Sequence, residues 1–138
     1  TTPADEPPAM ALHNLAGKGE TILVVDDEPP IVRLLNAQLT SAGYRVAAFT
    51  SSREALDSLA SSPDRYDMVI SDLTMPEITG DRLSFEIRTI RPDIPFILLT
   101  GKNTVNRLSR KITDNISALL TKPVNKQTLL KTIKESFR

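Results

Sequence analysis

The chain contains no cysteine and only one histidine among its 138 residues. The absence of cysteine excludes disulfide bonds, thiolate metal sites and catalysis by a thiol. The single histidine, His13, lies in an N-terminal stretch that offers no structured neighbourhood, so we expect no catalytic role for it. A nucleophile in this protein therefore has to come from another residue type.

The sequence also lacks long apolar runs and an excess of either charge. No stretch approaches the roughly 20 apolar residues of a membrane span, and no basic-then-apolar signal segment opens the chain. Together with the missing cysteine, this predicts a cytoplasmic protein without membrane contact. The 17 basic residues balance the 17 acidic ones, which argues against direct binding of nucleic acid.

Length and apolar content predict one domain with one core. Hydrophobic residues make up 40% of the chain, which suffices for a single core at this length. Residues 1–19 show no sustained apolar periodicity, so we interpret them as a flexible linker or tail and assign 20–138 to the domain. Because the chain begins with Thr rather than Met, we expect a fragment or a processed product.

Apolar runs alternate with amphipathic stretches five times, which is the pattern of βα units around a parallel sheet. The expected strands are residues 21–26, 44–49, 67–72, 95–100 and 116–121. The expected helices are about 30–42, a helix opened by the capping box Ser51-x-x-Glu54, 80–91, about 103–113, and a last helix capped by Asn125. In the first helix, Ile31, Leu34, Leu35 and Leu39 share one face and are expected to point inward.

These elements predict an α/β fold, a doubly wound (βα)5 parallel sheet. Short connections and right-handed crossovers leave few topologies, and the commonest is the flavodoxin-like strand order 2-1-3-4-5. Its switch point lies between the first and third strands. In such sheets, ligands bind beyond the carboxyl ends of the strands.

Polar residues follow four of the five strands. Asp26 and Asp27 come after the first strand, Asp72 ends the third, Thr100 ends the fourth, and Lys122 follows the fifth. Because the carboxyl ends of parallel strands meet at one edge, we expect these five side chains to converge there. Each has an ordinary interpretation when it is taken alone, such as a helix cap or a solvated loop residue. Complementary groups at four separate strand ends favour a functional site.

The chemistry of this set indicates a divalent cation and a phosphoryl group. Three carboxylates that lie close together repel one another and need a counter-charge. Oxygen ligands favour a hard ion, and Mg²⁺ in particular is held by one or two carboxylates with water and phosphate oxygens. Calcium fits less well because it takes more oxygen ligands and the sequence has no EF-hand loop.

The ammonium of Lys122 and the hydroxyl of Thr100 complete a site for phosphoryl transfer. A metal ion, a lysine and a hydroxyl stabilise the negative charge that spreads over the transferred oxygens. With no cysteine or usable histidine, the central Asp72 is the expected nucleophile, and its attack on phosphorus would give an aspartyl phosphate.

Two other phosphate-handling classes do not fit. A haloacid-dehalogenase-type phosphatase also uses an aspartate nucleophile, but it needs a second Asp two residues after the first, and Asp26-Asp27-Glu28-Pro29 lacks that spacing. A nucleotide site is unsupported, because no Gly-rich phosphate loop follows any strand.

Residues 20–138 resemble the receiver domain of two-component response regulators. The matching stretches are Ile22-Leu23-Val24-Val25-Asp26-Asp27-Glu28, Asp72-Leu73-Thr74-Met75-Pro76 with Gly80, Leu98-Leu99-Thr100-Gly101, and Lys122-Pro123. The resemblance implies that Asp72 is the phosphoacceptor. It implies Mg²⁺ ligands at Asp27, at Asp72 and at the backbone carbonyl of Thr74, with Asp26 acting partly through water.

The resemblance also implies roles for the remaining site residues and a partner. Thr100 and Lys122 would hold the phosphoryl oxygens, and a cis peptide bond between Lys122 and Pro123 would aim the lysine inward. The donor would be a phosphohistidine on a histidine kinase or a histidine phosphotransfer domain. The receiver itself would catalyse both its phosphorylation and its dephosphorylation.

One position departs from the family pattern. The family usually has an aromatic residue three positions before the lysine, whereas this chain has Leu119. We therefore expect the switch residue Thr100 to respond to phosphate, while the face formed by the fourth helix and fifth strand rearranges less or differently. Thr74 and Lys102 occupy positions at which the family tunes its dephosphorylation rate.

Three contexts for the receiver are open. The stretch Gly17-Lys18-Gly19-Glu20-Thr21-Ile22, the form of residues 72–76 and the end after the last helix favour the C-terminal receiver of a hybrid sensor histidine kinase. The alternatives are a stand-alone or truncated response regulator and an interaction module that is not phosphorylated. The input signal and the oligomeric state leave no trace in the sequence.

Overall fold

A parallel five-stranded sheet organises the chain, for which a computed structural model describes residues 16–101 and 115–137. All neighbouring strands pair in parallel, in the order β2-β1-β3-β4-β5. The strands are β1 (Thr21–Val25), β2 (Arg45–Phe49), β3 (Met68–Asp72), β4 (Phe96–Thr100) and β5 (Ala118–Thr121). The predicted fold class and strand order are confirmed, and the strands are shorter than expected by one or two residues at their ends.

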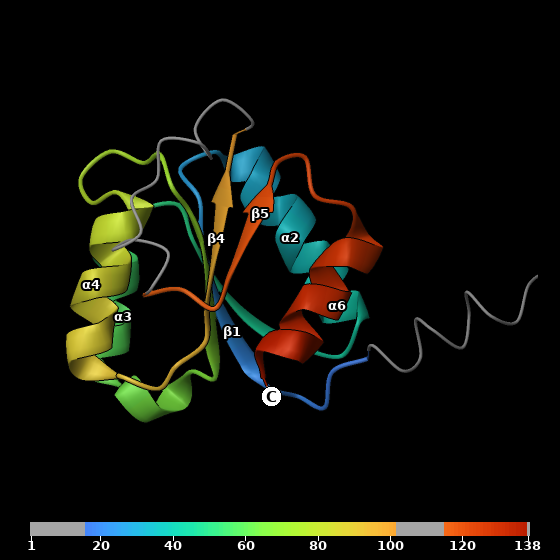
Figure 1. Ribbon diagram of the computed structural model, residues 1–138, viewed down its shortest axis with the longest axis horizontal. Helices are drawn as coiled ribbons and strands as arrows, with labels where there is room; N and C mark the ends of the chain where they lie inside the picture. Colours follow the sequence, from blue (N-terminus) through green and yellow to red (C-terminus); the bar gives the residue numbers. More distant parts are fainter. Residues whose placement is uncertain (1–15, 102–114, 138) are drawn as a thin grey trace, which may run out of the picture.

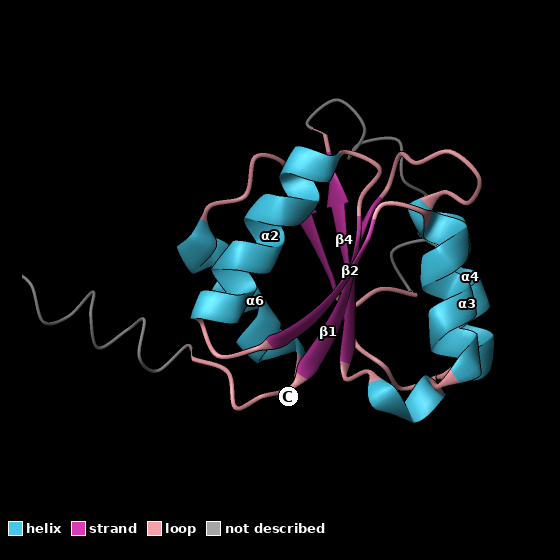
Figure 2. Ribbon diagram, turned by 180° about the vertical axis from the view of Figure 1, so that it is seen from behind, coloured by secondary structure: helices cyan, strands magenta, loops and turns pink. Residues whose placement is uncertain are grey.

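Helices cover both faces of the sheet (Figures 1 and 2). One face carries α2 (Pro29–Ser41) and α6 (Lys126–Ser136), and the other carries α3 (Ser52–Ser61) and α4 (Gly80–Ile90). A short 3-10 helix, Pro63–Arg65, precedes β3. The helix expected at about 103–113 lies outside the described residues.

The core consists of two apolar layers, one on each side of the sheet. Alternate residues of each strand enter opposite layers: Leu23 and Val25 face α3 and α4, whereas Ile22 and Val24 face α2 and α6. Every residue of β3 and of β4 is buried. This is why β4 reads as a continuous apolar run that ends in Thr100, and β3 as an apolar run followed by Ser71 and Asp72.

Both predicted helix caps are present. Ser51 Oγ accepts a hydrogen bond from the Glu54 amide (3.2 Å), and Asn125 Oδ1 accepts one from the Thr128 amide (2.7 Å). These side chains satisfy amide groups that the first turn of a helix leaves without a partner.

The prediction that Leu34 points inward is wrong. The buried residues of α2 are Val32, Leu35 and Leu39, whereas the Leu34 side chain is 52% exposed. The inward stripe follows Val32, Leu35 and Leu39 at spacings of three and four residues. Leu34 lies one residue before Leu35, about 100° away around the helix, and so leaves that stripe.

Two glycines before β1 contact the domain. The amide of Gly17 donates to the Ala42 carbonyl (2.6 Å), and the amide of Gly19 donates to the Gly43 carbonyl (2.9 Å). A methyl group on Gly17 would lie 2.6 Å from Cδ1 of Tyr44, so the backbone packs directly on that ring. The boundary between a linker at 1–19 and a domain at 20–138 stays a prediction, and residues 1–15 lie outside the described part.

The C-terminal end of the described chain also packs on the Tyr44 ring. Phe137, just after α6, stacks on the Tyr44 ring with 6.4 Å between the ring centroids. Both ends of the described domain therefore lie at the edge of the sheet where the strands begin (Figure 1). None of the described helices has the length and apolar character that crossing a membrane requires.

Candidate functional site

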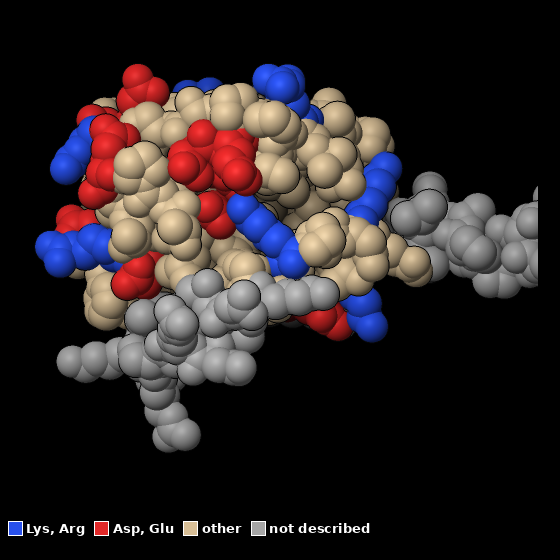
Figure 3. Space-filling model, turned by 90° about the horizontal axis from the view of Figure 1, so that it is seen from above, with Lys and Arg blue, Asp and Glu red and all other residues tan. Residues whose placement is uncertain are grey.

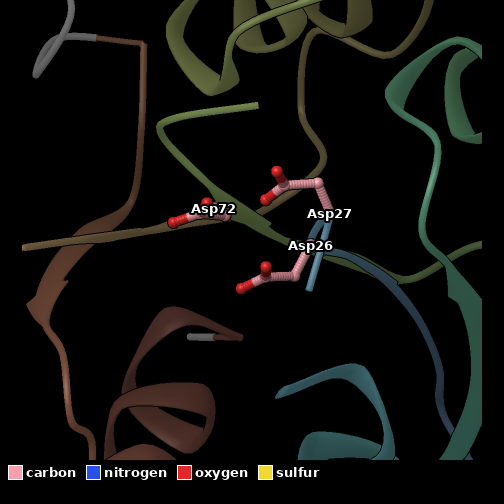
Figure 4. Close-up of side chains that lie close together, drawn as sticks. All are labelled: Asp26, Asp27 and Asp72. Atoms are coloured by element: carbon pink, nitrogen blue, oxygen red, sulfur yellow. The ribbon is translucent and has the colours of Figure 1, made fainter. Parts of the chain in front are cut away.

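Three aspartates converge at the carboxyl ends of β1 and β3. Asp26 and Asp27 follow β1 and Asp72 ends β3. The parallel register pairs Val25 with Ser71, which brings the next residues of the two strands together. Carboxylate oxygens of all three lie within 4.8 Å of one another (Figure 4). Asp26 and Asp72 are buried, whereas Asp27 is exposed.

Lys122 contacts two of these carboxylates. Its Nζ donates to Asp26 Oδ2 at 2.8 Å and lies 2.9 Å from Asp72 Oδ1. The peptide bond between Lys122 and Pro123 is cis. The other oxygen of Asp26, Oδ1, accepts a hydrogen bond from the Glu28 amide (2.9 Å), so Asp26 also fixes the turn that leads into α2. Among residues 16–101 and 115–137, the site holds three carboxylates against one ammonium.

The surroundings shift the pKa of Asp72 and of Lys122. Burial raises the pKa of Asp72, the charges of Asp26 and Asp27 add to this, and the Lys122 contact opposes it without cancelling it. Burial alone would lower the pKa of Lys122. Its hydrogen bonds to Asp26 and Asp72 outweigh that effect, and the pKa of the lysine is raised. The ammonium is therefore firmly protonated at neutral pH.

Acidic side chains gather on the surface around this edge. Seen from above, the face beyond the strand ends shows a central group of acidic side chains next to a basic one (Figure 3). Asp27 and Glu28, which follow β1, are exposed, whereas Asp26 and Asp72 are buried. The uncompensated negative charge is open to solvent, from which a cation can reach it.

Thr100 and Thr74 lie at the same edge of the sheet. Thr100 ends β4 and is 1% exposed, and its hydroxyl makes a long contact of 3.4 Å to the Gly101 carbonyl. Thr74 is exposed in the loop after β3. No hydrogen bond joins Thr100 to the three carboxylates within the described residues. Leu119 is half-buried in β5 and packs against the core layer under α3 and α4. Lys102 lies outside the described residues.

Gly80 contacts the backbone of the strand end that carries Asp72, and the sequence motif does not reveal this contact. Its amide donates to the Leu73 carbonyl (2.8 Å). A methyl group at Gly80 would lie 2.3 Å from the Asp72 carbonyl oxygen and 2.9 Å from Leu73 Cα. The first turn of α4 therefore touches the backbone of Asp72, and only glycine allows this contact.

An apolar groove of about 310 Å³ adjoins the site. Its lining joins one face of α2 to the segment after β5 and consists of Ile31, Leu34, Leu35, Gln38, Leu99, Lys122, Pro123 and Val124. The apolar pattern of the sequence does not indicate this groove, because it predicts Leu34 in the core.

Comparison with known proteins identifies relatives across most of the chain. The model of the family "Response regulator receiver domain" matches residues 22–134. The transcriptional regulatory protein GlrR of Escherichia coli K12 is 35% identical over 123 residues, which are 89% of this chain and 27% of that protein. The response regulator MprA of Mycolicibacterium vanbaalenii is 32% identical over 85% of this chain and 50% of its own. The chain thus spans about a quarter to a half of these curated relatives.

Solved structures of receiver domains and response regulators are also similar to this chain. A response regulator receiver domain protein from Clostridium thermocellum has a TM-score of 0.80 at 30% identity and covers 86% of this chain and 94% of its own. The response regulator protein TrrA from Thermotoga maritima, in complex with Mg(2+)-BeF, has a TM-score of 0.76 at 34% identity and covers 85% and 98%. Fold, acidic cluster and sequence similarity lead to one conclusion: this chain belongs to the response regulator receiver domain family of two-component signalling.

Proposed function

We propose that the domain accepts a phosphoryl group on Asp72 from a phosphohistidine of a partner protein, with Mg²⁺ as cofactor. A receiver domain implies a histidine kinase or a phosphotransfer protein as partner in general. The observation that carries the proposal is the place of the Asp72 carboxylate. It is buried, in contact with Lys122, and within 4.8 Å of the carboxylate oxygens of Asp26 and Asp27.

The residues present fit a hard divalent cation. The cluster offers oxygen ligands only, it carries more negative charge than Lys122 neutralises, and Asp27 opens it to solvent. Asp26, Asp27 and Asp72 would hold Mg²⁺, together with the backbone carbonyl of Thr74. The bound ion would supply positive charge to the phosphoryl oxygens. The complex of the relative TrrA with Mg(2+)-BeF supports this assignment.

In the proposed transfer, Asp72 is the nucleophile. A carboxylate oxygen forms the new bond to phosphorus while the bond between phosphorus and the donor's imidazole nitrogen breaks, and that nitrogen takes the electron pair. The contact with Lys122 lowers the pKa of Asp72 against the effect of burial and so favours the ionised, nucleophilic form. Lys122 already touches an Asp72 oxygen, so its ammonium is within reach of a phosphoryl group bound there. The buried Thr100 would donate its hydroxyl from the neighbouring strand.

We assign the apolar groove beside Lys122 to the partner that carries the phosphohistidine. That partner has to bring its phosphoryl group to the pocket in which Lys122 lies, and Lys122 also lines the groove. Leu34 is one of two large apolar side chains that are exposed in the described residues, and a partner surface would bury it.

For the parent protein we propose a hybrid sensor histidine kinase with this receiver at its C-terminus, on the strength of residues 17–22 and 72–76. The alternative is a response regulator, and it is supported by relatives such as GlrR and MprA, which bear regulator names. The coding sequence on both sides of this chain distinguishes the two, because a histidine kinase domain upstream is required only by the first.

The proposed function is tested by intact-protein mass after incubation with acetyl phosphate. We expect one phosphoryl adduct that requires Mg²⁺ and is missing in the variant Asp72→Asn. If the folded protein gains no adduct from acetyl phosphate or from phosphoramidate, the phosphoacceptor role is wrong and the domain is an interaction module.

A further inference from the structure

The loop that follows the phosphoacceptor strand is held by a buried serine of α3. Ser52 is 2% exposed, and its hydroxyl makes two hydrogen bonds to this loop, residues 73–79. It donates to the Pro76 carbonyl at 3.0 Å and accepts from the Ile78 amide at 3.0 Å. The loop is the yellow-green segment above α4 in Figure 1. One hydroxyl thus acts as donor and acceptor to two backbone groups that are two residues apart.

The residue between those two contacts is strained. Glu77 has a φ of 68°, in the left-handed region that residues other than glycine rarely adopt. Its carboxylate accepts a hydrogen bond from Ser51 Oγ at 2.8 Å. Strained backbone persists only where the surroundings hold it, and it gathers at sites whose geometry matters for function. Here Ser52 fixes the backbone on both sides of the strained residue, and Ser51 holds its side chain.

The other end of the loop is fixed at Asp72 itself. The Gly80 amide binds the Leu73 carbonyl, and the backbone of Gly80 packs on the Asp72 carbonyl. Thr74 therefore lies between two anchors, Leu73 on one side and the segment bound by Ser52 on the other. Its backbone has little freedom only as long as both anchors hold.

We propose that Ser52 is a positioning residue for phosphoryl transfer at Asp72, acting through the loop that carries Thr74. The inference rests on the proposed function, because it gives the backbone carbonyl of Thr74 the role of a metal ligand. Ser52 touches neither the carboxylates nor the substrate. Its hydroxyl keeps the loop in the conformation that Mg²⁺ needs, so removal of the hydroxyl weakens metal binding rather than the nucleophile.

The test is the rate of Asp72 phosphorylation by acetyl phosphate as a function of Mg²⁺ concentration. Ser52→Ala removes both hydrogen bonds, but the Ile78 amide keeps its hydrogen bond to the Pro76 carbonyl, so the net loss is close to that of one bond, or about a fivefold change in an equilibrium constant. We therefore expect Ser52→Ala to need about fivefold more Mg²⁺ for half-maximal rate, with the rate at saturating Mg²⁺ much less affected. Ser52→Thr keeps the hydroxyl and should resemble wild type. Ser61→Ala removes an exposed serine at the far end of the same helix and is the matched control.

A purely structural role for Ser52 gives a different result. It would lower the melting temperature of Ser52→Ala and leave the Mg²⁺ requirement unchanged, and that outcome overturns the inference. A shift in Ser52→Thr as large as in Ser52→Ala also overturns it, because the hydroxyl would then not be the cause. If wild type forms no adduct, the proposed function fails. In that case the inference is tested by the rise in melting temperature on adding Mg²⁺, which should be smaller for Ser52→Ala than for wild type and Ser52→Thr. An equal rise in all three proteins overturns it.

A second variant tests the loop from its exposed side if Ser52→Ala does not fold. Glu77→Ala removes the acceptor of Ser51 and keeps the β-carbon that makes a φ of 68° strained, so the loop loses a support while the core stays intact. We expect a higher Mg²⁺ requirement here too. A requirement equal to that of wild type would show that loop order does not control metal binding.

Discussion

Lys122 and Asp26 are 96 positions apart in the sequence, and their side chains meet at 2.8 Å. The bond ties the segment after β5 to the segment after β1, across β3 and β4 of the sheet. The same ammonium lies 2.9 Å from Asp72. Without a metal ion, one positive charge is thus shared by two buried carboxylates, and Asp27 adds a third carboxylate for which the described part of the chain places no further cation in the cluster.

This shortage of positive charge predicts that Asp72→Asn raises the free energy of unfolding in EDTA at pH 7. The pKa of Asp72 is raised in the folded state, first by burial and then by Asp26 and Asp27, so its ionised form destabilises the fold. That cost grows as the pH rises from the ordinary pKa of an aspartate through the raised one. Urea unfolding should show a gain from Asp72→Asn at pH 7 that shrinks towards pH 4. A less stable variant at pH 7 would mean that Lys122 outweighs burial.

The contact between Gly80 and the backbone of Asp72 predicts that Gly80→Ala destabilises the protein. Alanine in a helix is favoured over glycine by about 1 kcal/mol. At this position its methyl group would lie 2.3 Å from the Asp72 carbonyl oxygen, and that overlap with backbone should cost more, for a net loss of about 2 kcal/mol. Gly101→Ala is the control, because a methyl group there meets nothing within 4 Å. Equal stability of the two variants in urea would contradict the close approach.

The buried Tyr44 hydroxyl predicts a stabilising substitution. It has no hydrogen-bond partner within the described residues, so Tyr44→Phe should raise the free energy of unfolding at pH 7 by about 1 kcal/mol. Burial, with a contribution from Glu20, raises the pKa of Tyr44 to about 12. Because the folded pKa exceeds the ordinary value of 10.0, stability is lost as the pH rises from about 10 towards 12.

Between pH 9 and pH 11.5, the free energy of unfolding of wild type should fall by about 2 kcal/mol more than that of Tyr44→Phe, since the variant has no phenol to ionise at this position. Chemical denaturation at pH 9 and pH 11.5 measures the difference, and the lysines that titrate in both proteins cancel. Identical pH profiles would indicate that the hydroxyl reaches water in solution.

The exposed position of Leu34 beside Lys122 predicts that its removal slows phosphoryl transfer from the protein donor only. Leu34→Ala removes exposed apolar area beside Lys122, and phosphorylation by the cognate phosphohistidine protein should slow about tenfold, as expected for one apolar side chain buried in an interface. Phosphorylation by acetyl phosphate should be unchanged. Phe85→Ala is the matched control, because Phe85 is also a large, exposed apolar residue and lies on α4, on the opposite face of the sheet. Equal slowing by both variants would place the partner elsewhere.

The leucine at position 119 predicts that β5 changes conformation only slightly when a phosphoryl mimic binds. It is half-buried in β5 and stands where the family usually has an aromatic residue. Amide NMR shifts with and without Mg²⁺ and beryllofluoride should change strongly at Thr100 and weakly at residues 118–121. Changes in β5 as large as those at Thr100 would show that leucine transmits the switch.

The fold and the acidic site could be predicted because both depend on patterns along single strands. The residues of β3 and β4 are buried on both faces, so each strand begins as an apolar run, and polar residues mark its carboxyl end: Ser71 and Asp72 in β3, and Thr100 in β4. Once the strand order is known, the positions of Asp26 and Asp72 follow from parallel pairing.

The features that could not be predicted depend on contacts between elements. Ser52 is adjacent to a capping serine, and nothing in its own neighbourhood indicates that its hydroxyl binds a loop 24 residues further on. Leu34 shares an apolar stripe with its neighbours in sequence, yet the rotation of α2 on the sheet decides which side of that stripe meets solvent. Periodicity fixes the width of an apolar face but not the part of it that the neighbouring elements cover.

The packing of Gly17 and Phe137 on the same tyrosine has a consequence for how this domain joins other protein segments. Both ends of the described chain leave from the pole at which the strands start (Figure 1), and Asp72, the last residue of β3, lies at the opposite pole. A segment attached directly to either of these described ends would therefore join the domain at the pole away from Asp72. The described domain can therefore be joined to other protein segments at the pole where its strands begin, while the acidic cluster at the other pole stays open to solvent.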